Sequence, residues 1–269
     1  MFYKASHEYV RYMSETNVRV EWHNNIASVI VDRVDSLNAL NVSTLREMEK
    51  KIDQTADEKA DVLLLRGAGD EAFIAGADIG YMQDLSTSEA EEWGDLGHNV
   101  AKKLENYPMP TIAAIDGYAF GGGTELSLAC DIRIASDDAM LGQTEIEIGI
   151  IPGWGGTQRL PRIVGDEMAR RMIYLGERID AETAKQRGLV SEVIPNAEFE
   201  SRLFGLAEEL ANKPSFALQT AKQSINQAHE ASLEAGLAHE KRAFASLFDT
   251  HDQKEGMTAF LEDRNPEFE

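Results

Sequence analysis

The fold is decided by residues 110–161, PTIAAIDGYAFGGGTELSLACDIRIASDDAMLGQTEIEIGIIPGWGGTQRLP. Residues 111–115 are a short apolar run between a proline and a glycine, which is typical of a strand buried on both faces. Residues 117–123 are rich in glycine and interrupt regular structure. Residues 124–130 predict the start of a buried helix, and residues 131–135 predict a second strand. This alternation of strand and helix favours the α/β class.

A glycine triplet, Gly121 to Gly123, separates the first strand from the helix. Without side chains, its backbone N–H groups stay uncovered, and the helix dipole adds partial positive charge there. Such a turn can hold a phosphate or an oxyanion that forms on a carbonyl. Neither G-x-G-x-x-G nor G-x-x-x-x-G-K-[ST] is present, which favours the oxyanion. From the residues alone, a glycine turn used only for close packing is an equal alternative.

Two glutamates follow the triplet, Glu125 in the first helical turn and Glu145 in a loop. Each has an ordinary explanation, since an acid is favoured near a helix N-terminus and an acid in a loop is usually solvated. Both nevertheless lie among apolar residues. Two carboxylates beside an oxyanion site would form a coherent acid–base arrangement, so both are candidate catalytic residues.

Three motifs together resemble the crotonase superfamily, and within it the enoyl-CoA hydratases: GYAFGGGTELSLACDIRIAS, LGQTEIEIGIIPGWGGTQRLPRIVG and IAGADI at 74–79. The resemblance runs from about residue 18 to the C-terminus. It implies an α/β fold with a crotonase-like ββα spiral core and a C-terminal helical trimerisation region. It also implies that the N–H groups of Gly122 and Ala77 hold the thioester oxygen, with Glu125 and Glu145 as the catalytic pair.

Many relatives keep only one of the two glutamates, so a chain with both resembles the hydratases. The expected reaction is reversible hydration of a short-chain, crotonyl-CoA-like trans-2-enoyl-CoA to a 3-hydroxyacyl-CoA. By the same resemblance, Trp154 is a candidate cap of the acyl pocket that limits chain length, although an aromatic residue in a glycine loop is more often simple packing. The expected substrate-binding residues are Leu37, Ala75, Asp78, Ile79, Gly153 and Trp154.

Three positions depart from the family pattern, which often has lysines that contact the CoA phosphates. This chain has Asp35, Gly80 and Asp263 instead. The candidate substitutes are Arg33, Lys254 and Arg264, or cations of the medium that bridge the acidic surface and the phosphates.

The 269 residues include 47 Asp and Glu against 26 Lys and Arg, a net charge of −21 that is spread along the whole chain. This charge opposes binding to nucleic acid or to an anionic membrane surface. It predicts either salt adaptation or an ordinary acidic enzyme.

No apolar run is long enough to span a membrane. Cys130 is the only cysteine, which predicts a reducing, cytoplasmic location. The six histidines lie outside every motif, so neither a metal nor a cofactor beyond the CoA of the substrate is expected.

The expected organisation is an N-terminal extension at 1–12, a catalytic core at 13–197 and a helical region at 198–269. A hairpin is predicted from strands at 18–22 and 26–31, with a further strand at 61–67 and a loop at 68–78. Helices are predicted at 43–54, 86–105, 166–175, 181–187, 198–212, 215–231, 233–248 and 252–262.

Several alternatives stay open at this point. One is another crotonase-type reaction, such as enoyl-CoA isomerisation or acyl-CoA hydrolysis. A second is dehydration of 3-hydroxypropionyl-CoA, which is the same chemistry in reverse. A third is a non-catalytic binding protein, although the charge opposes RNA. A nicotinamide dehydrogenase would need a fingerprint that is absent. The resemblance further implies a homo-oligomer, either a trimer or a dimer of trimers, that acts on an acyl-CoA.

Overall fold

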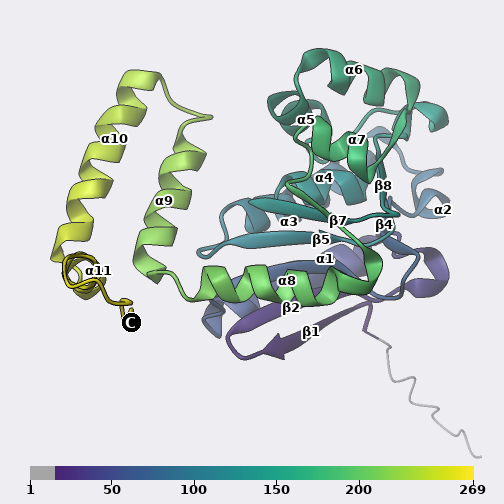
Figure 1. Ribbon diagram of the computed structural model, residues 1–269. Helices are drawn as coiled ribbons and strands as arrows, with labels where there is room; N and C mark the ends of the chain where they lie inside the picture. The colour runs from purple at the N-terminus through teal and green to yellow at the C-terminus, as the bar shows by residue number, and fades with distance from the viewer. Residues whose placement is uncertain (1–15) are drawn as a thin grey trace, which may run out of the picture.

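The computed structural model describes residues 16–269, so the expected extension at 1–12 lies outside the described residues. A six-stranded sheet in the order β1-β2-β3-β5-β7-β10 forms its centre (Figure 1). The first two strands form the predicted hairpin, and every other neighbouring pair is parallel. The strands are β1 (Val18–His23), β2 (Ile26–Val31), β3 (Val62–Gly67), β5 (Thr111–Ile115), β7 (Ile132–Ser136) and β10 (Glu192–Ile194).

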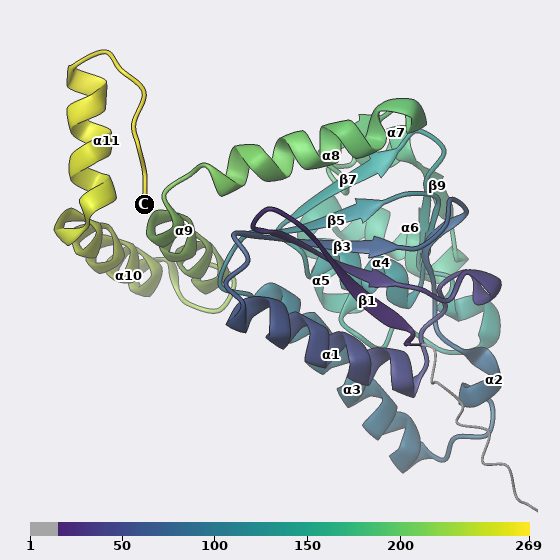
Figure 2. The ribbon, with the colours of Figure 1, turned by 90° about the horizontal axis from the view of Figure 1, so that it is seen from below.

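Helices cover both faces of this sheet. In Figure 2, α8 (Asn196–Ala211) lies on one face, while α1 (Val42–Asp57) and α3 (Thr87–Glu105) lie on the other. In β3, Leu63 and Leu65 pack into the larger core, and Leu64 packs with residues of α8. Burial of each such side chain contributes about 1.5–3 kcal/mol. Burial on both faces explains why β2, β3 and β5 are mostly apolar, whereas the edge strand β1 alternates polar and apolar residues.

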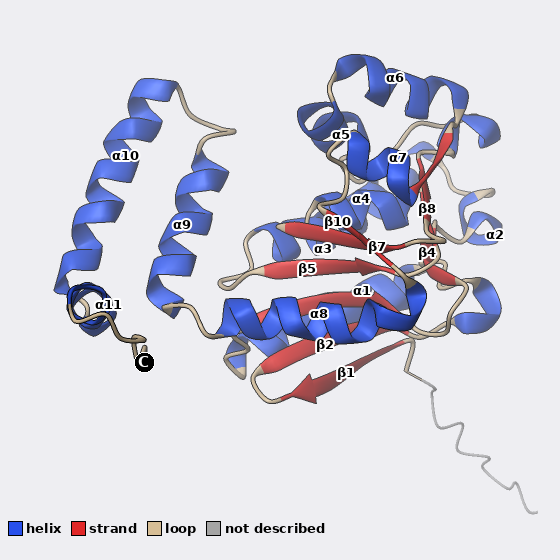
Figure 3. Cartoon of the chain, viewed as in Figure 1, coloured by secondary structure: helices blue, strands red, loops and turns tan. Residues whose placement is uncertain are grey.

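A second sheet has four short strands in the order β4-β6-β8-β9 (Figure 3). They are β4 (Ala72–Ala75), β6 (Tyr118–Phe120), β8 (Met140–Gly142) and β9 (Arg178–Asp180). The sequence predicts loops for the first two, because strands of three or four residues beside glycines carry no periodic signal. The chain passes from β3 to β4, from β5 to β6 and from β7 to β8. Each turn of the spiral therefore contributes one strand to each sheet.

The remaining core helices lie near the predicted positions, except the short one at 79–82, which was not predicted. They are α2 (Ile79–Met82), α4 (Gly122–Leu128), α5 (Gly156–Val164), α6 (Asp166–Leu175) and α7 (Ala181–Gln186), with short 3-10 turns η1 (Val34–Ser36), η2 (Glu145–Ile148) and η3 (Leu247–Asp249). Helix α4 begins two residues earlier than predicted, because Gly122 is already helical.

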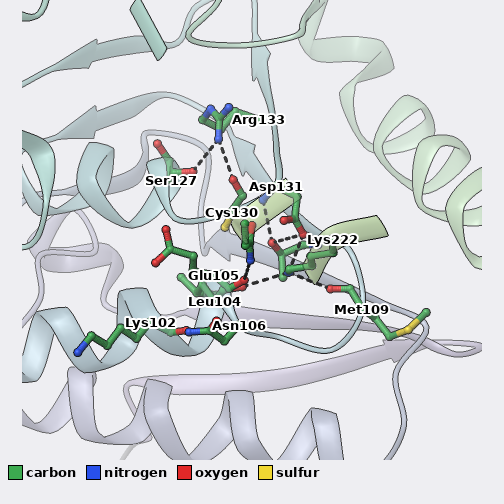
Figure 4. Close-up of polar contacts among 12 residues, drawn as sticks. Lys102, Leu104, Glu105, Asn106, Met109, Ser127, Cys130, Asp131, Arg133 and Lys222 are labelled. Carbon is green, nitrogen blue, oxygen red and sulfur yellow. Dashed lines mark hydrogen bonds and ion pairs between the residues drawn. The ribbon is translucent and has the colours of Figure 1, made fainter. Parts of the chain in front are cut away.

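Three C-terminal helices extend away from the sheets (Figures 1 and 2). They are α9 (Ser215–Gln227), α10 (Leu233–Ser246) and α11 (His251–Leu261). Lys222 of α9 fixes this group to the core, since its Nζ donates to Asp131 Oδ2 at 2.7 Å and to the Met109 carbonyl at 3.2 Å (Figure 4). Helix α8 packs on the sheet, so the region from residue 198 contains one core helix and three extended ones.

Candidate active site

Strands β4, β6 and β8 are parallel neighbours, so their carboxyl ends lie at the same edge of the second sheet. Ala77 follows the first strand, Gly121 and Gly122 follow the second, and Glu145 follows the third. This arrangement brings together segments that are far apart in the sequence. It explains why the short sheet, which the sequence analysis did not predict, positions the site.

The N–H groups of Ala77 and Gly122 both lie at the pocket and have no acceptor within residues 16–269. Ala77 forms a bridge with Leu40, but that bridge uses the neighbouring Gly76 carbonyl and Asp78 N–H, at 2.9 and 2.8 Å. Gly122 is the first residue of α4, where an N–H has no partner in its own helix. Two unpaired N–H groups on one pocket can stabilise an oxyanion.

Each position of the triplet requires glycine for a different structural reason. Gly121 has φ +50°, and a Cβ there would lie 3.2 Å from Glu145 Oε1. A Cβ on Gly122 would lie 2.3 Å from the Trp154 ring, and one on Gly123 would lie 1.9 Å from the Ile74 carbonyl oxygen. Close packing and an accessible N–H are thus both present, so the two explanations of the triplet do not exclude each other.

Glu125 is buried, with 2% of its surface exposed, and its carboxylate is held by backbone. Its Oε1 accepts hydrogen bonds from Trp154 N–H and Gly156 N–H, each at 2.7 Å. Burial raises the pKa of Glu125, while the hydrogen bonds from Gly156 and Trp154 oppose that rise. Both of these bonds are made to Oε1, on the wall of the pocket.

Glu145 is held very differently. Both of its carboxyl oxygens are buried, and neither has a hydrogen-bond partner within residues 16–269. Burial, followed by the charge of Glu125, raises the pKa of Glu145 to about 7. A carboxyl group in these surroundings is protonated for much of the time near neutral pH. The site therefore pairs a hydrogen-bonded carboxylate with a carboxyl group that can carry a proton.

These groups open into one pocket of about 580 Å³ with a mostly apolar lining. Trp154 and Trp93 form part of its wall, with ring centroids 5.2 Å apart in an edge-to-face arrangement. The predicted residues on the lining are Ala75, Ala77, Ile79, Gly122, Glu125, Glu145, Gly153 and Trp154. The pocket is large enough for a small acyl group beside the two carboxyl groups.

The model of one family, described as enoyl-CoA hydratase/isomerase, matches residues 21–269. The chain belongs to the enoyl-CoA hydratase/isomerase family. It is 40% identical to the crotonyl-CoA hydratase of Syntrophomonas wolfei, over 95% of this chain and 99% of that protein. It is 41% identical to the short-chain-enoyl-CoA hydratase of Clostridium acetobutylicum, over 95% and 98%. These matches confirm the predicted resemblance.

The crystal structure of the enoyl-CoA hydratase from Bacillus anthracis resembles this structure with a TM-score of 0.89 at 38% identity, covering 94% of this chain and 98% of that one. The structure of Pseudomonas aeruginosa DspI gives a TM-score of 0.90 at 35% identity, over 97% and 100%. The predicted fold class is therefore confirmed. The role of the C-terminal helices in trimerisation stays a prediction.

Two residues that the sequence analysis placed at the substrate do not line the pocket of this family member. The Leu37 carbonyl accepts the Ala75 N–H at 3.0 Å. The Asp78 side chain caps α2 by accepting the Tyr81 N–H at 3.1 Å. In this structure both residues support the loop that presents Ala77.

The structure also places an ion pair on the lining that the sequence analysis did not single out. Arg178 of β9 binds Glu147 through two hydrogen bonds of 3.2 and 2.6 Å, and its guanidinium lies 5.5 Å from the centroid of the Phe120 ring. The partners are 31 residues apart, so no local pattern links them.

Within residues 16–269, no group of three His, Cys, Asp or Glu side chains is arranged to hold a metal ion. No helix in the same range has the length and apolarity to cross a membrane.

Proposed function

We propose that this protein catalyses the reversible hydration of short-chain trans-2-enoyl-CoA thioesters to 3-hydroxyacyl-CoA. The observation that carries the proposal is the pair Glu125 and Glu145, one hydrogen-bonded to backbone and one without a partner among residues 16–269, in a pocket with two N–H groups that have no acceptor in the same range. Relatives at about 40% identity that are named crotonyl-CoA hydratase and short-chain-enoyl-CoA hydratase support it.

In the hydration direction, the thioester oxygen accepts hydrogen bonds from Gly122 N–H and Ala77 N–H. One such donor stabilises the developing negative charge by roughly 3–4 kcal/mol. Glu125 accepts a proton from the water whose oxygen bonds to C3, and the π electrons of the double bond move toward the thioester. Glu145 then donates its proton to C2. A proton returns from Glu125 to Glu145 before the next turnover, which restores the starting state of the pair.

The wall formed by Trp154 and Trp93 supports a short acyl chain. Trp154 is 3% exposed, and its ring lies between Gly97 and Gly122, where a Cβ on either glycine would come within 2.3 Å of it. Its Nε1 donates to the Trp93 carbonyl at 3.3 Å. A ring fixed on so many sides cannot move aside easily, so it limits the space beyond C4 of the acyl group.

Lys254 is the strongest candidate for the CoA phosphates among the three basic residues considered. Arg264 already binds Glu255 through two hydrogen bonds of 2.6 and 2.9 Å and Glu262 through one of 2.9 Å. Arg33 donates to the Ala39 carbonyl. Lys254 is exposed and has no ion pair within residues 16–269. Its charge is therefore free to meet an anionic ligand.

A homo-oligomer, either a trimer or a dimer of trimers, is supported by the extended C-terminal helices. These helices expose many large apolar side chains, and a contiguous apolar patch of this kind often marks an interaction surface. The exposed side chains include Phe216, Ile225, Leu233, Leu237, Phe244, Phe248, Met257, Phe260 and Leu261. A cytoplasmic location rests on the single cysteine.

The test is the loss of the conjugated-enone absorbance of crotonyl-CoA, with the product identified by chromatography against authentic 3-hydroxybutyryl-CoA. We expect rapid loss with formation of that product. A parallel reaction with a 3-enoyl-CoA separates hydration from isomerisation. Absence of hydration with crotonyl-CoA, at low and at multimolar potassium chloride, together with conversion of the 3-enoyl-CoA, would replace the hydratase with an isomerase.

A further inference from the structure

The carboxylate of Glu125 takes its position from the loop at residues 153–156. Two N–H groups of this loop, from Trp154 and Gly156, bind the same oxygen at 2.7 Å. A shift of the loop would therefore move the carboxylate or break these bonds. Whatever fixes the loop also fixes the group that receives the proton of water.

Arg159 of α5 binds this loop. Its Nη1 donates to the Trp154 carbonyl at 3.0 Å, while the N–H of the same Trp154 binds Glu125. Gly155 makes this approach possible, since a Cβ there would lie 2.1 Å from Arg159 Nη1. Gly155 also has φ +114°, in the left-handed region that favours glycine. The absence of a side chain at Gly155 therefore allows Arg159 to bind the loop.

Glu105, the last residue of α3, fixes Arg159 in turn. Its two oxygens accept from Arg159 Nε at 3.2 Å and from Arg159 Nη2 at 2.9 Å, a bidentate pair in which the arginine side chain is only 17% exposed. All three of these arginine nitrogens therefore have a partner, two on Glu105 and one on the loop.

The same end of α3 is held by α9. Asn226 Nδ2 donates to the Glu105 carbonyl at 2.9 Å. Lys222 Nζ donates to the Leu104 carbonyl at 3.4 Å, and Figure 4 shows this lysine reaching from α9 to the end of α3 and to Asp131. A continuous set of hydrogen bonds thus leads from α9 through Glu105 and Arg159 to Glu125.

We propose that Arg159 is a positioning residue for the hydration reaction. It holds the loop that orients the Glu125 carboxylate, and Glu105 ties it to helix α9. The inference rests on the proposed function, because it assumes that Glu125 receives the proton of water. It extends that function to a residue outside the pocket lining.

The pH dependence of kcat can distinguish a positioning role of Arg159 from a purely structural one. Among the charged side chains within residues 16–269, Arg159 lowers the pKa of Glu125, and Glu145, Glu147 and Arg178 line the same pocket. Burial raises the pKa of Glu125, and the charge of Arg159 opposes this rise. Removal of Arg159 should therefore raise the pKa further and weaken the two N–H bonds at once. Since Glu125 must be ionised, the acid limb of the kcat profile should move to higher pH.

The experiment compares Arg159→Ala and Arg159→Lys with the matched control Arg162→Ala, one turn along the exposed side of α5. The measurements are kcat and KM for crotonyl-CoA from pH 5 to 9. We expect Arg159→Ala to lower kcat at least 20-fold, to change KM less than threefold and to shift the acid limb upward by at least half a pH unit. Arg159→Lys should be intermediate, and the control should match wild type.

Glu105→Gln keeps the shape of the side chain that binds Arg159 and removes its charge. If Arg159→Ala fails to fold, this variant tests the same set of hydrogen bonds. It should lower kcat several-fold with an upward shift of the acid limb. The inference is overturned if the acid limb stays in place in every folded variant, or if Arg159→Ala retains kcat within twofold of the control. Hydration by the wild-type protein, measured beside them, tests the proposed function separately.

Discussion

Glu125 and Glu145 lie in one pocket in opposite hydrogen-bonding states. Glu125 accepts hydrogen bonds from two backbone N–H groups at 2.7 Å, and both oxygens of Glu145 are buried without a partner in the described part of the chain, residues 16–269. Hydrogen bonds to the ionised form favour ionisation, and unpaired burial favours the neutral form. Burial raises the pKa of both groups, and only Glu125 has backbone donors that oppose the rise, which fits its proposed role as the proton acceptor and that of Glu145 as the donor.

Neutral replacement of either glutamate should nearly abolish hydration. Glu125→Gln and Glu145→Gln should each lower kcat by roughly 10²- to 10⁴-fold, the range that a general acid or base provides. Glu182→Gln, at an exposed position at the start of α7, is the control and should retain wild-type activity. Stopped assays with crotonyl-CoA provide the rates, and calorimetry with a non-reactive acyl-CoA should show unchanged binding. A turnover within tenfold of wild type in either variant would remove that glutamate from the mechanism.

The raised pKa of Glu145 should also be visible in stability. In the folded protein this pKa is about 7, against an ordinary value of 4.5, so the folded state binds a proton that the unfolded state has lost between these values. The favourable contribution is present at low pH and is lost as pH rises through about 7. At 1.36 kcal/mol per pKa unit, the change from 4.5 to about 7 amounts to roughly 3.4 kcal/mol.

Glu145→Gln removes this titration. Between pH 5 and pH 8, the Tm of the wild-type protein should fall more than the Tm of the variant. The Tm of the variant minus that of wild type should therefore increase as pH rises. Glu182→Gln serves as the control and should follow wild type at both pH values. Parallel curves for wild type and Glu145→Gln would show that Glu145 is ordinarily ionised in the folded state.

The sequence predicted those strands and site residues whose pattern lies within a single continuous segment. The apolar runs of β3, β5 and β7 predicted the central sheet, and the quoted motifs located Ala77, Gly122 and both glutamates. The short strands β4, β6 and β8 were missed, because three or four residues are too few for a period of two. Only their parallel pairing explains why Ala77, Gly122 and Glu145, which are 45 and 23 residues apart in the sequence, meet at one site.

Interactions between distant residues were not accessible from the sequence. Arg159 lies within a quoted motif, but its partner Glu105 is 54 residues away, and an arginine on a helix is usually solvated. Leu37 and Asp78 were expected at the substrate from the family resemblance of the segments that contain them. Their backbone and side-chain bonds to Ala75 and Tyr81 show that proximity in sequence does not determine which side chain reaches the pocket.

Removal of the Trp154 indole should extend the range of acyl chains. Trp154→Ala keeps the backbone N–H that binds Glu125 and opens the wall beside Trp93. A longer acyl chain could then bury its extra methylenes, each worth roughly 0.8 kcal/mol. We expect the ratio of kcat/KM for trans-2-octenoyl-CoA to that for crotonyl-CoA to rise at least tenfold. Trp22→Ala, on the half-exposed strand β1, should leave the ratio unchanged. An unchanged ratio in folded Trp154→Ala would assign the chain-length limit to other residues.

Salt should increase both stability and activity. The chain carries 47 acidic and 26 basic side chains, a net charge of −21. The first turns of α3 illustrate the effect, because Glu89, Glu91, Glu92 and Asp95 are exposed there without a basic neighbour in the same turns. Repulsion among such charges opposes the compact state and also the approach of the anionic substrate. At multimolar salt the Debye length is about 3 Å or less, so this repulsion is largely screened.

Raising potassium chloride from 0.1 M to 2 M should therefore raise Tm by several degrees and increase kcat/KM for crotonyl-CoA. A general effect of salt on hydrophobic contacts would act equally on charge variants, so the double substitution Glu91→Lys, Glu92→Lys separates the two causes. If screening is responsible, the variant should be more stable than wild type at 0.1 M and should gain less from 2 M salt. An identical gain in both proteins would assign the effect to apolar burial, and no gain in either would show that the acidic surface is not an adaptation to salt.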